Sequence, residues 1–353
     1  MASLTVKGTA IRGIASAVPA GIQSTEDLAK LFGAAEAEKI AQASGVRTRR
    51  IVRPGQCCSD LCFAAGESLL DELGWDRGSV DALVFVSHSF DYPLPATSCI
   101  LQDRLKLPKT CAAFDVGLGC SGYIYGLWIC SGLIATGCKR VLLLAGETAS
   151  RMVSPNDRTT VPLFGDAGTA TALESDGSTP IHFQLGTDGA GYKHLIMPAG
   201  TSTGRLPHSV ETMTRSPQAD TNIRGQEDLF MNGAEVFAFT LREVPPMISE
   251  LMKRSAWTND EVDRFFLHQA NEFMLVHLAR RMGLPPAKVP MILKDFGNTS
   301  SASIPLTITL TAREILAKQK LKLVLAGFGV GLSWGACALE MESIVAPALV
   351  EVP

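Results

Sequence analysis

Runs of apolar residues bounded by turn residues recur along the chain. The clearest are "DALVFVSH", "CAAFDVGL", "RVLLLAGE", "DRFFLHQA" and "LKLVLAGFG", at residues 81–88, 111–118, 140–147, 263–270 and 321–329. Their length and continuous apolarity are typical of strands buried on both faces of a sheet. Helix-length stretches lie between them, at 97–106, 121–136, 271–282 and 300–318. This alternation predicts an α/β protein with a largely parallel sheet.

A weak internal repeat adds to this pattern. Residues 81–108 resemble 263–285 in order and spacing, and 139–147 resemble 320–329, at an offset of about 181 residues. A duplicated α/β unit predicts two similar halves, 1–178 and 179–353, packed face to face with a site between them. Chance similarity between α/β strands is the alternative.

The same offset places Ser301, in "FGNTSSASIP" (296–305), opposite Cys120. Both loops follow a predicted strand and open a predicted helix. If the halves are related by pseudo-symmetry, the two helix N-termini meet near the interface, and the loop that carries His268 lies close to them. Residues distant in sequence then share one pocket.

Size and composition agree with a two-part molecule. The chain has 353 residues, more than one hydrophobic core usually organises, and 46% of them are hydrophobic against 19% charged. The formal net charge of −3 offers no global attraction to nucleic acid or anionic membrane. We found no uninterrupted apolar stretch of about 18 residues. These observations favour a cytoplasmic enzyme that acts on small molecules, without nucleic-acid or membrane partners.

The cysteines form no metal-binding pattern. Nine are present, with no CxxC pair and no Cys/His cluster at zinc spacing, at positions 57, 58, 62, 99, 111, 120, 130, 138 and 337. We therefore expect no metal site. An odd number of cysteines within apolar runs is more typical of reduced thiols in a cytoplasm than of a disulfide framework.

One cysteine differs from the rest. In "DVGLGCSGYIYG" (115–126), Cys120 lies between glycines, where a strand ends and the helix 121–136 begins. The positive end of that helix would favour the thiolate and make the sulfur a nucleophile. Alternatively, Cys120 fills the core, since free cysteine is among the most buried residue types.

Two further residues have suitable chemistry. His268 ends a predicted buried strand in "FLHQAN" (266–271), and Asn298 precedes a helix in "GNTSSASIP" (297–305). Separately, they have ordinary interpretations, as a structural histidine and a helix-capping asparagine. Together, a thiolate, a neutral imidazole and a carboxamide suit acyl transfer with carbanion chemistry, because the last two stabilise a negative oxygen.

Four motifs resemble a known family. "DVGLGCSG", "HQAN", "GNTSSASIP" and "FGVGLSWG" (328–335) are similar, in order and spacing, to the β-ketoacyl-acyl-carrier-protein synthase III group of the thiolase superfamily. The resemblance covers nearly the whole chain. It implies the five-layered αβαβα thiolase fold, built from two duplicated halves and usually found as a homodimer. It also implies acyl-CoA or acyl-carrier-protein thioesters as substrates, with no metal and no tightly bound cofactor.

The resemblance also implies roles for individual residues. Cys120 would attack an acyl thioester, and the backbone N–H groups of Cys120 and Val330 would form the oxyanion hole. His268 and Asn298 would hold the thioester carbonyl of a malonyl- or β-ketoacyl-type partner during Claisen condensation. The implied function is an acyltransferase of fatty-acid or secondary-metabolite biosynthesis. The residues implied to bind substrate are Arg158, Gly233, Asn271 and Phe328.

The sequence departs from the family pattern around the substrate entrance. The stretch 31–50 has no tryptophan to stack on the adenine of coenzyme A, and Ala234 stands where asparagine is usual. Val330 replaces a glycine, and Pro93, Leu94 and Pro95 lie in a segment that in relatives reaches toward the partner subunit. We therefore expect an altered acyl specificity. Arg47, Arg49 and Arg50 either line a docking surface for an acidic carrier or form a solvated turn.

Three other functions remain open at this point. The first is acyl transfer from Cys120 to a hydroxyl or amine, without carbon–carbon bond formation. The second is a cysteine hydrolase of the α/β-hydrolase type, although "LGCSG" is only an approximate nucleophile elbow. The third is a non-catalytic subunit that pairs with an active homologue.

Overall fold

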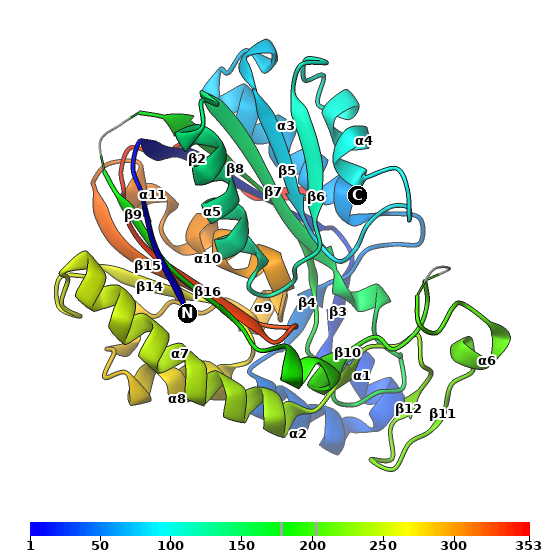
Figure 1. Ribbon diagram of the computed structural model, residues 1–353. Coiled ribbons are helices and arrows are strands. Elements are labelled where there is room, and N and C mark those ends of the chain that lie inside the picture. The colour runs from blue at the N-terminus through cyan, green and yellow to red at the C-terminus, as the bar shows by residue number, and fades with distance from the viewer. Residues whose placement is uncertain (177–178, 202–203) are drawn as a thin grey trace.

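The computed structural model of the protein describes residues 1–176, 179–201 and 204–353 and is built around two large sheets (Figure 1). The first has the strand order β17 (Val350–Val352), β2 (Thr9–Pro19), β8 (Asp166–Ser175), β7 (Arg140–Thr148), β5 (Ala82–Val86), β6 (Ala112–Val116). The second has the order β1 (Ala2–Val6), β9 (Ile181–Thr187), β16 (Ser333–Met341), β15 (Leu321–Gly329), β14 (Arg264–Leu267).

Helices form three layers around these sheets. Helices α3 (Cys58–Leu73) and α4 (Thr97–Arg104) pack on the first sheet, and α7 (Gly233–Ser255), with α8 (Glu272–Arg281) beside it, packs on the second. Between the sheets lie α5 (Gly122–Ala135) and α10 (Ser303–Thr311), each in contact with both (Figure 1). This arrangement confirms the five-layered αβαβα thiolase fold.

Shorter elements lie at the edges of these layers. They are β3 (Ile22–Ser24), α1 (Thr25–Phe32), α2 (Ala34–Ser44), β4 (Thr48–Arg50), β10 (Leu195–Ile196), α6 (Val210–Met213), β11 (Ser216–Pro217), β12 (Ile223–Arg224), β13 (Phe230–Met231), α9 (Leu293–Phe296) and α11 (Arg313–Leu316). A 3₁₀ turn, η5 (Ser300–Ala302), leads directly into α10.

The five apolar runs form β5, β6, β7, β14 and β15, as predicted. Two details of the prediction are wrong. The sheets are mixed, because β7 pairs antiparallel with β8 and β15 pairs antiparallel with β16. Strand β6 is half-exposed instead of buried on both faces, because it forms the edge of the first sheet.

The proposed halves exchange strands at both chain ends. Strand β1, from the first half, pairs with β9 in the second sheet, and β17, from the second half, pairs with β2 in the first. The division into residues 1–178 and 179–353 stays a prediction, and its boundary at residue 178 lies outside the described residues. The exchanged strands tie the two sheets together.

Close packing of α3 on the first sheet depends on glycine. A Cβ atom built on Gly168 of β8 would lie 2.4 Å from the backbone nitrogen of Cys62 and 2.6 Å from the carbonyl carbon of Leu61. Both atoms belong to the backbone of α3, so neither moves without shifting the helix. The missing side chain of Gly168 therefore sets the distance between α3 and the sheet.

We expect Gly168→Ala to destabilise the protein by about 1–3 kcal/mol, because the new methyl group overpacks the contact between helix and sheet. Gly132 in α5 is the control, since a Cβ there meets nothing within 4 Å. Gly132→Ala should raise stability by about 0.5–1 kcal/mol through helix propensity. Urea unfolding of both variants tests the assignment, and equal effects of the two substitutions would contradict it.

Candidate active site

Cys120 lies where the two halves of the molecule meet. It directly precedes α5, whose N-cap is Ser121, and only 8% of it is exposed. A Cβ atom built on Gly329, at the end of β15, would lie 2.7 Å from the Cys120 Cβ and 2.9 Å from its sulfur. The backbone of the second sheet therefore packs directly against the sulfur-bearing residue of the first half.

Backbone donors surround the Cys120 sulfur. The N–H groups of Val330 and of Cys120 itself lie beside it, and each lowers the pKa of the thiol. The Ser300 hydroxyl oxygen lies 3.8 Å from the sulfur. The two N–H groups expected to form the oxyanion hole are thus brought together at one atom.

The Cys120 thiol is nevertheless protonated at neutral pH. Burial raises the pKa of Cys120 to about 11, and the Glu147 carboxylate also raises it, against the lowering contribution of Ser300 and the backbone. The loss of hydration on burial is the largest of these contributions. A protonated thiol is a weaker nucleophile than a thiolate.

His268 follows β14 and is buried, with 2% of its surface exposed. Its Nδ1 atom lies 2.7 Å from the Ser303 hydroxyl oxygen, and its ring packs edge-on against Phe328, with centroids 5.5 Å apart. Burial lowers the pKa of His268 to about 3, against the opposing effect of a backbone hydrogen bond with Ser300. The imidazole is therefore neutral, as the sequence interpretation required.

Asn298 lies in the turn between α9 and η5 and is also buried. Its Oδ1 atom accepts a hydrogen bond of 2.9 Å from the Ser300 N–H, and its Nδ2 group donates to the Ala270 carbonyl at 3.5 Å. Its own N–H donates to the Leu163 carbonyl at 2.9 Å. These contacts hold the carboxamide between the loops that carry His268 and Ser300.

Ser300 joins the three predicted residues. Its hydroxyl contacts the Cys120 sulfur, its N–H bonds Asn298, and its backbone bonds His268. The pseudo-symmetric counterpart predicted for Cys120 was the next residue, Ser301, whose hydroxyl donates to the Gly146 carbonyl at 3.0 Å. The duplication therefore led to the right loop, one residue away from the contact.

A cavity of about 450 Å³ opens onto the Cys120 sulfur. Cys120, Ser300, Val330, His88 and Glu147 are among the residues that line it. The rest is largely apolar and includes Met152, Phe164, Leu195, Ile196, Met197 and Leu229. His268 and Asn298 do not line the cavity. Both contact Ser300, which does line it.

The residues predicted to bind substrate lie outside this lining. Arg158 is exposed, Gly233 is the exposed first residue of α7, and Asn271 caps α8 by accepting a hydrogen bond of 2.8 Å from the Met274 N–H. Phe328 is buried against His268. Their substrate contacts stay predictions.

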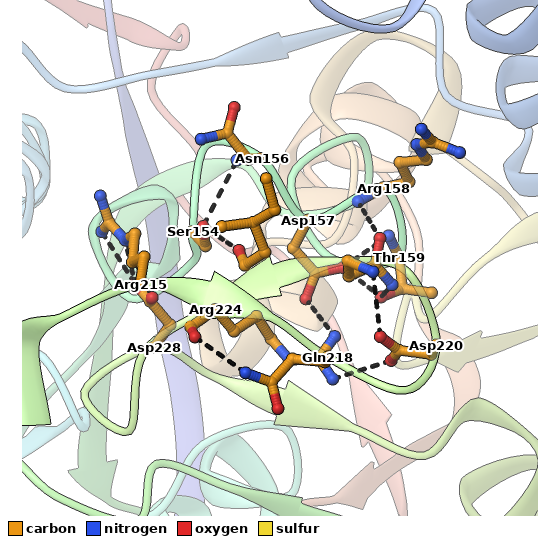
Figure 2. Close-up of polar contacts among 12 residues, drawn as sticks. Ser154, Asn156, Asp157, Arg158, Thr159, Arg215, Gln218, Asp220, Arg224 and Asp228 are labelled. Atoms are coloured by element: carbon orange, nitrogen blue, oxygen red, sulfur yellow. Dashed lines mark hydrogen bonds and ion pairs between the residues drawn. The ribbon is translucent and has the colours of Figure 1, made fainter.

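Buried ion pairs fix the segment next to Arg158 (Figure 2). Arg224 of β12 pairs with Asp157 at 3.0 Å and with Asp220 at 2.7 Å, and the Asp157 side chain is fully buried. Figure 2 shows Arg158 at the edge of this network, with its guanidinium directed away from it. The Leu229 N–H donates to the Met152 carbonyl at 2.7 Å. The ion pairs therefore anchor a segment that continues into the cavity wall.

The three arginines after α2 are not free charges. Arg49 is buried and donates to the Phe164 carbonyl at 2.6 Å, while Arg47 pairs with Glu38 and Arg50 pairs with Glu351, each at 2.6 Å. Burial lowers the pKa of Arg49 to about 10. Arg49 therefore neither lines a docking surface nor lies in a solvated turn, and both hypotheses are wrong for this residue. It instead holds β4 against the segment that contains Phe164.

Comparisons with known proteins agree with the geometry. Family models described as 3-oxoacyl-[acyl-carrier-protein] synthase III and as its C-terminal part match residues 114–189 and 252–341. The β-ketoacyl-[acyl-carrier-protein] synthase III of Symbiobacterium thermophilum is 35% identical over 340 residues, which cover 96% of this chain and 99% of that protein.

Solved structures give the same result. The 3-oxoacyl-(acyl-carrier protein) synthase of Burkholderia xenovorans is 42% identical, with a TM-score of 0.93 over 99% of both chains. The priming β-ketosynthase of a polyketide biosynthetic pathway is 26% identical, with a TM-score of 0.83 over 96% of this chain and 97% of that one. The chain belongs to the β-ketoacyl-[acyl-carrier-protein] synthase III family. It is an acyltransferase that works by Claisen condensation, in fatty-acid or secondary-metabolite biosynthesis.

Family membership makes the hydrolase and non-catalytic hypotheses wrong. In the part of this synthase III chain that the structure describes, no group of three His, Cys, Asp or Glu side chains is arranged to hold a metal ion. Within the same residues, no helix is long and apolar enough to cross a membrane. All nine cysteines are free thiols.

Sequence analysis missed three residues of the synthase III site. Ser300 was in a quoted motif, but its contact with Cys120 depends on the packing of the two halves. Glu147 and His88 are each the last residue of a predicted apolar strand. An ionisable residue at the end of a buried strand is a candidate for a functional site, and this pattern could have identified both residues. Both line the cavity beside Cys120.

We expect Arg224→Ala to lower the free energy of unfolding by about 3–5 kcal/mol, because it leaves the buried Asp157 carboxylate without its partner. The control is Lys30→Ala, which breaks an exposed pair with Asp27 and should change stability little. Thermal and urea unfolding measure both effects. A small change for Arg224→Ala would contradict the anchoring role.

Proposed function

We propose that Cys120 carries the acyl group, and that His268 and Asn298 stabilise the enolate of the extender. The observation that supports this most directly is the convergence of the Cys120 and Val330 N–H groups on a sulfur at the end of an apolar cavity. Ser300 adds support, because it contacts all three residues.

The first step forms the acyl-enzyme. The donor carbonyl oxygen lies between the N–H groups of Cys120 and Val330, which stabilise the negative charge that develops there. The sulfur bonds to the carbonyl carbon, the thiol proton leaves, and the bond to the donor sulfur breaks. The carrier departs as a thiol once it regains a proton.

The second step is decarboxylative condensation. A malonyl-type thioester loses CO₂, and its carbonyl oxygen takes the resulting enolate charge. Neutral His268 and the Asn298 carboxamide donate hydrogen bonds to this oxygen. The imidazole is suited to this role because its pKa of about 3 keeps it uncharged. The enolate carbon then bonds to the acyl carbonyl carbon, and the bond from that carbon to the Cys120 sulfur breaks. The sulfur leaves as a thiolate and takes up a proton from solvent, which restores the thiol.

The lining of the cavity supports the proposal that the acyl group is uncharged and apolar. The ionisable residues that line the cavity are Tyr192, His88, Glu147 and Cys120 itself. No lysine or arginine appears in the lining formed by the described residues. A carboxylate on the acyl chain would therefore have no cation to pair with, and its burial would be costly.

We further propose that Arg158, Gly233, Asn271 and Phe328 contact the donor or its carrier arm. Arg158 supports contact with phosphates, because its guanidinium is exposed and points away from the network in Figure 2. Gly233 and Asn271 lie at the starts of α7 and α8. Coenzyme A and an acyl carrier protein both present such an arm, and both remain candidates for the donor.

Incubation with acyl-CoA and acyl-carrier thioesters, followed by intact mass spectrometry, should reveal a covalent adduct on the native enzyme. Cys120→Ala should abolish the adduct, whereas Cys99→Ala, which removes an exposed thiol, should retain it. His268→Ala and Asn298→Ala should still form the adduct. Their release of CO₂ from a malonyl donor should fall by roughly 10²–10³-fold, since each lacks one donor to the enolate.

Two outcomes would contradict the proposal. An adduct on the Cys120→Ala variant would show that another residue is the nucleophile. Turnover of the native enzyme without CO₂ release would favour acyl transfer to a hydroxyl or amine.

We also propose a cytoplasmic homodimer. Edge strand β6 leaves backbone groups unpaired, and the neighbouring loop exposes Phe90 (40%), Tyr92 (59%) and Leu94 (81%). A second copy that pairs along β6 would cover these side chains. Nine free thiols agree with a reducing compartment.

In such a dimer, Leu94 reaches the acyl site of the partner. We expect Leu94→Trp to shift the preference toward shorter acyl chains and Leu94→Ala toward longer ones, because the residue changes the space available. Competition between acyl donors, read by adduct mass, measures the shift. Ile22→Trp, at another exposed apolar position, is the control and should leave the preference unchanged.

A further inference from the structure

The most unusual group in the cavity is a buried carboxylate that the condensation mechanism leaves without a role. Glu147, near the end of β7, is 2% exposed and lines the cavity with Cys120. One of its oxygens, Oε1, accepts three hydrogen bonds, from the Ser87 hydroxyl at 2.9 Å, the Ser89 hydroxyl at 2.8 Å and the His88 N–H at 2.8 Å. These bonds fix the orientation of the carboxylate.

The other oxygen, Oε2, is connected to the Cys120 sulfur through the Ser300 side chain. The Ser300 hydroxyl donates to Glu147 Oε2 at 3.1 Å, and the same hydroxyl oxygen lies 3.8 Å from the Cys120 sulfur. With its proton directed at Glu147, the hydroxyl turns its lone pairs toward the thiol. The three groups therefore form a chain from S–H through O–H to carboxylate.

The backbone at Ser300 supports a functional role. Its φ of 51° lies in the left-handed region, which costs a residue other than glycine on the order of 1–3 kcal/mol. Packing and hydrogen bonds around Ser300 maintain this conformation, which directs the hydroxyl between Glu147 and Cys120.

We propose that Ser300 and Glu147 form the proton relay that activates Cys120. During attack, the Cys120 proton moves to the Ser300 hydroxyl oxygen, and the Ser300 hydroxyl proton moves to Glu147 Oε2. The sulfur–carbon bond forms at the same time. When the donor carbon–sulfur bond breaks, the proton returns from Glu147 through Ser300 to the departing thiolate. The relay begins and ends with Glu147 ionised and Ser300 neutral, and needs no co-reactant.

The relay explains why a protonated thiol is no obstacle to reaction. His268 is a poor acceptor for the thiol proton, because its low pKa makes it a weak base. Glu147 instead reaches the sulfur through one hydroxyl. Its charge opposes formation of a free thiolate beside it, so proton transfer and attack are expected to be concerted.

Other titratable groups face the relay, and their effect on the pH dependence must be distinguished from that of Glu147. Cys58 of α3 contacts the Ser87 hydroxyl at 3.7 Å, and burial raises its pKa well above the ordinary value. His268 stays neutral over the accessible pH range. The remaining neighbours are Cys62, packed beside Gly146, and His88 and Tyr192, which line the cavity.

The test rests on the proposed function and uses two variants of the full chain. Ser300→Gly removes the hydroxyl, while its backbone adopts the left-handed conformation without strain, so the bonds to Asn298 and His268 can form. Glu147→Gln removes the charge with little change in shape. Ser301→Ala is the matched control, because it deletes a neighbouring buried hydroxyl that bonds backbone carbonyls. Thermal unfolding confirms that each variant is folded.

Acylation is measured by mass spectrometry with the fastest donor found among acetyl-, hexanoyl- and decanoyl-thioesters of coenzyme A and of acyl carrier protein. Near pH 7, Ser300→Gly and Glu147→Gln should acylate roughly 10²-fold more slowly than the native enzyme. The deficit of Ser300→Gly should shrink by about tenfold per pH unit as the pH rises, because the thiolate then forms without the relay. Ser301→Ala should follow the native profile.

Alkylation by iodoacetamide, mapped to Cys120, provides the second measurement. Glu147→Gln should alkylate at lower pH than the native enzyme, because the neighbouring negative charge is gone, although its acylation is slower. A purely structural role would lower both rates in parallel at every pH. That result, or unchanged acylation in both variants, would overturn the relay.

His88→Gln completes the set. If the pH profile of acylation changes with His88 and not with Glu147, the histidine is the proton acceptor and the relay is wrong. Failure of the proposed function has a different signature, because the native enzyme would then form no adduct on Cys120 with any of these donors.

Discussion

The site depends on the close approach between the end of β15 and the residue before α5. A Cβ atom at Gly327 would lie 2.7 Å from the Cys120 carbonyl oxygen, and one at Gly329 would lie 2.9 Å from the sulfur. Only a backbone without side chains fits there. This contact brings the Val330 N–H to the sulfur, and the neighbouring loop brings Ser300. It also buries the Cys120 side chain.

Exclusion of water determines the charge states in the site. Burial raises the pKa of Cys120 to about 11 and lowers that of His268 to about 3, so both side chains are neutral at pH 7. Burial also raises the pKa of the nearby Asp166 to about 6. Such surroundings suit chemistry in which negative charge appears on an oxygen and neutral donors receive it. They also suit an apolar acyl chain.

Different parts of the chain contribute different groups to the candidate site. The Cys120 thiol precedes α5, and the buried Glu147 carboxylate lies in β7. The His268 imidazole follows β14, the Asn298 carboxamide precedes η5, and the glycine-rich loop follows β15. The buried pair of Arg224 and Asp157 joins β12 to the segment between β7 and β8, which contributes Met152 and Phe164 to the cavity lining. The residues of the candidate site are therefore brought together by contacts between the two sheets, and neither sheet carries all of them.

The sequence by itself determined the strands, the duplicated pattern and the combination of Cys120, His268 and Asn298. Each of these is expressed in local periodicity or in short motifs. Only the tertiary structure decided that β6 is an edge strand, that Arg49 is buried, and that Ser300 lies between Cys120 and Glu147. It also decided that burial raises the pKa of Cys120. The reason is that burial, and contacts between residues far apart in the sequence, depend on which faces of the sheets and helices pack together.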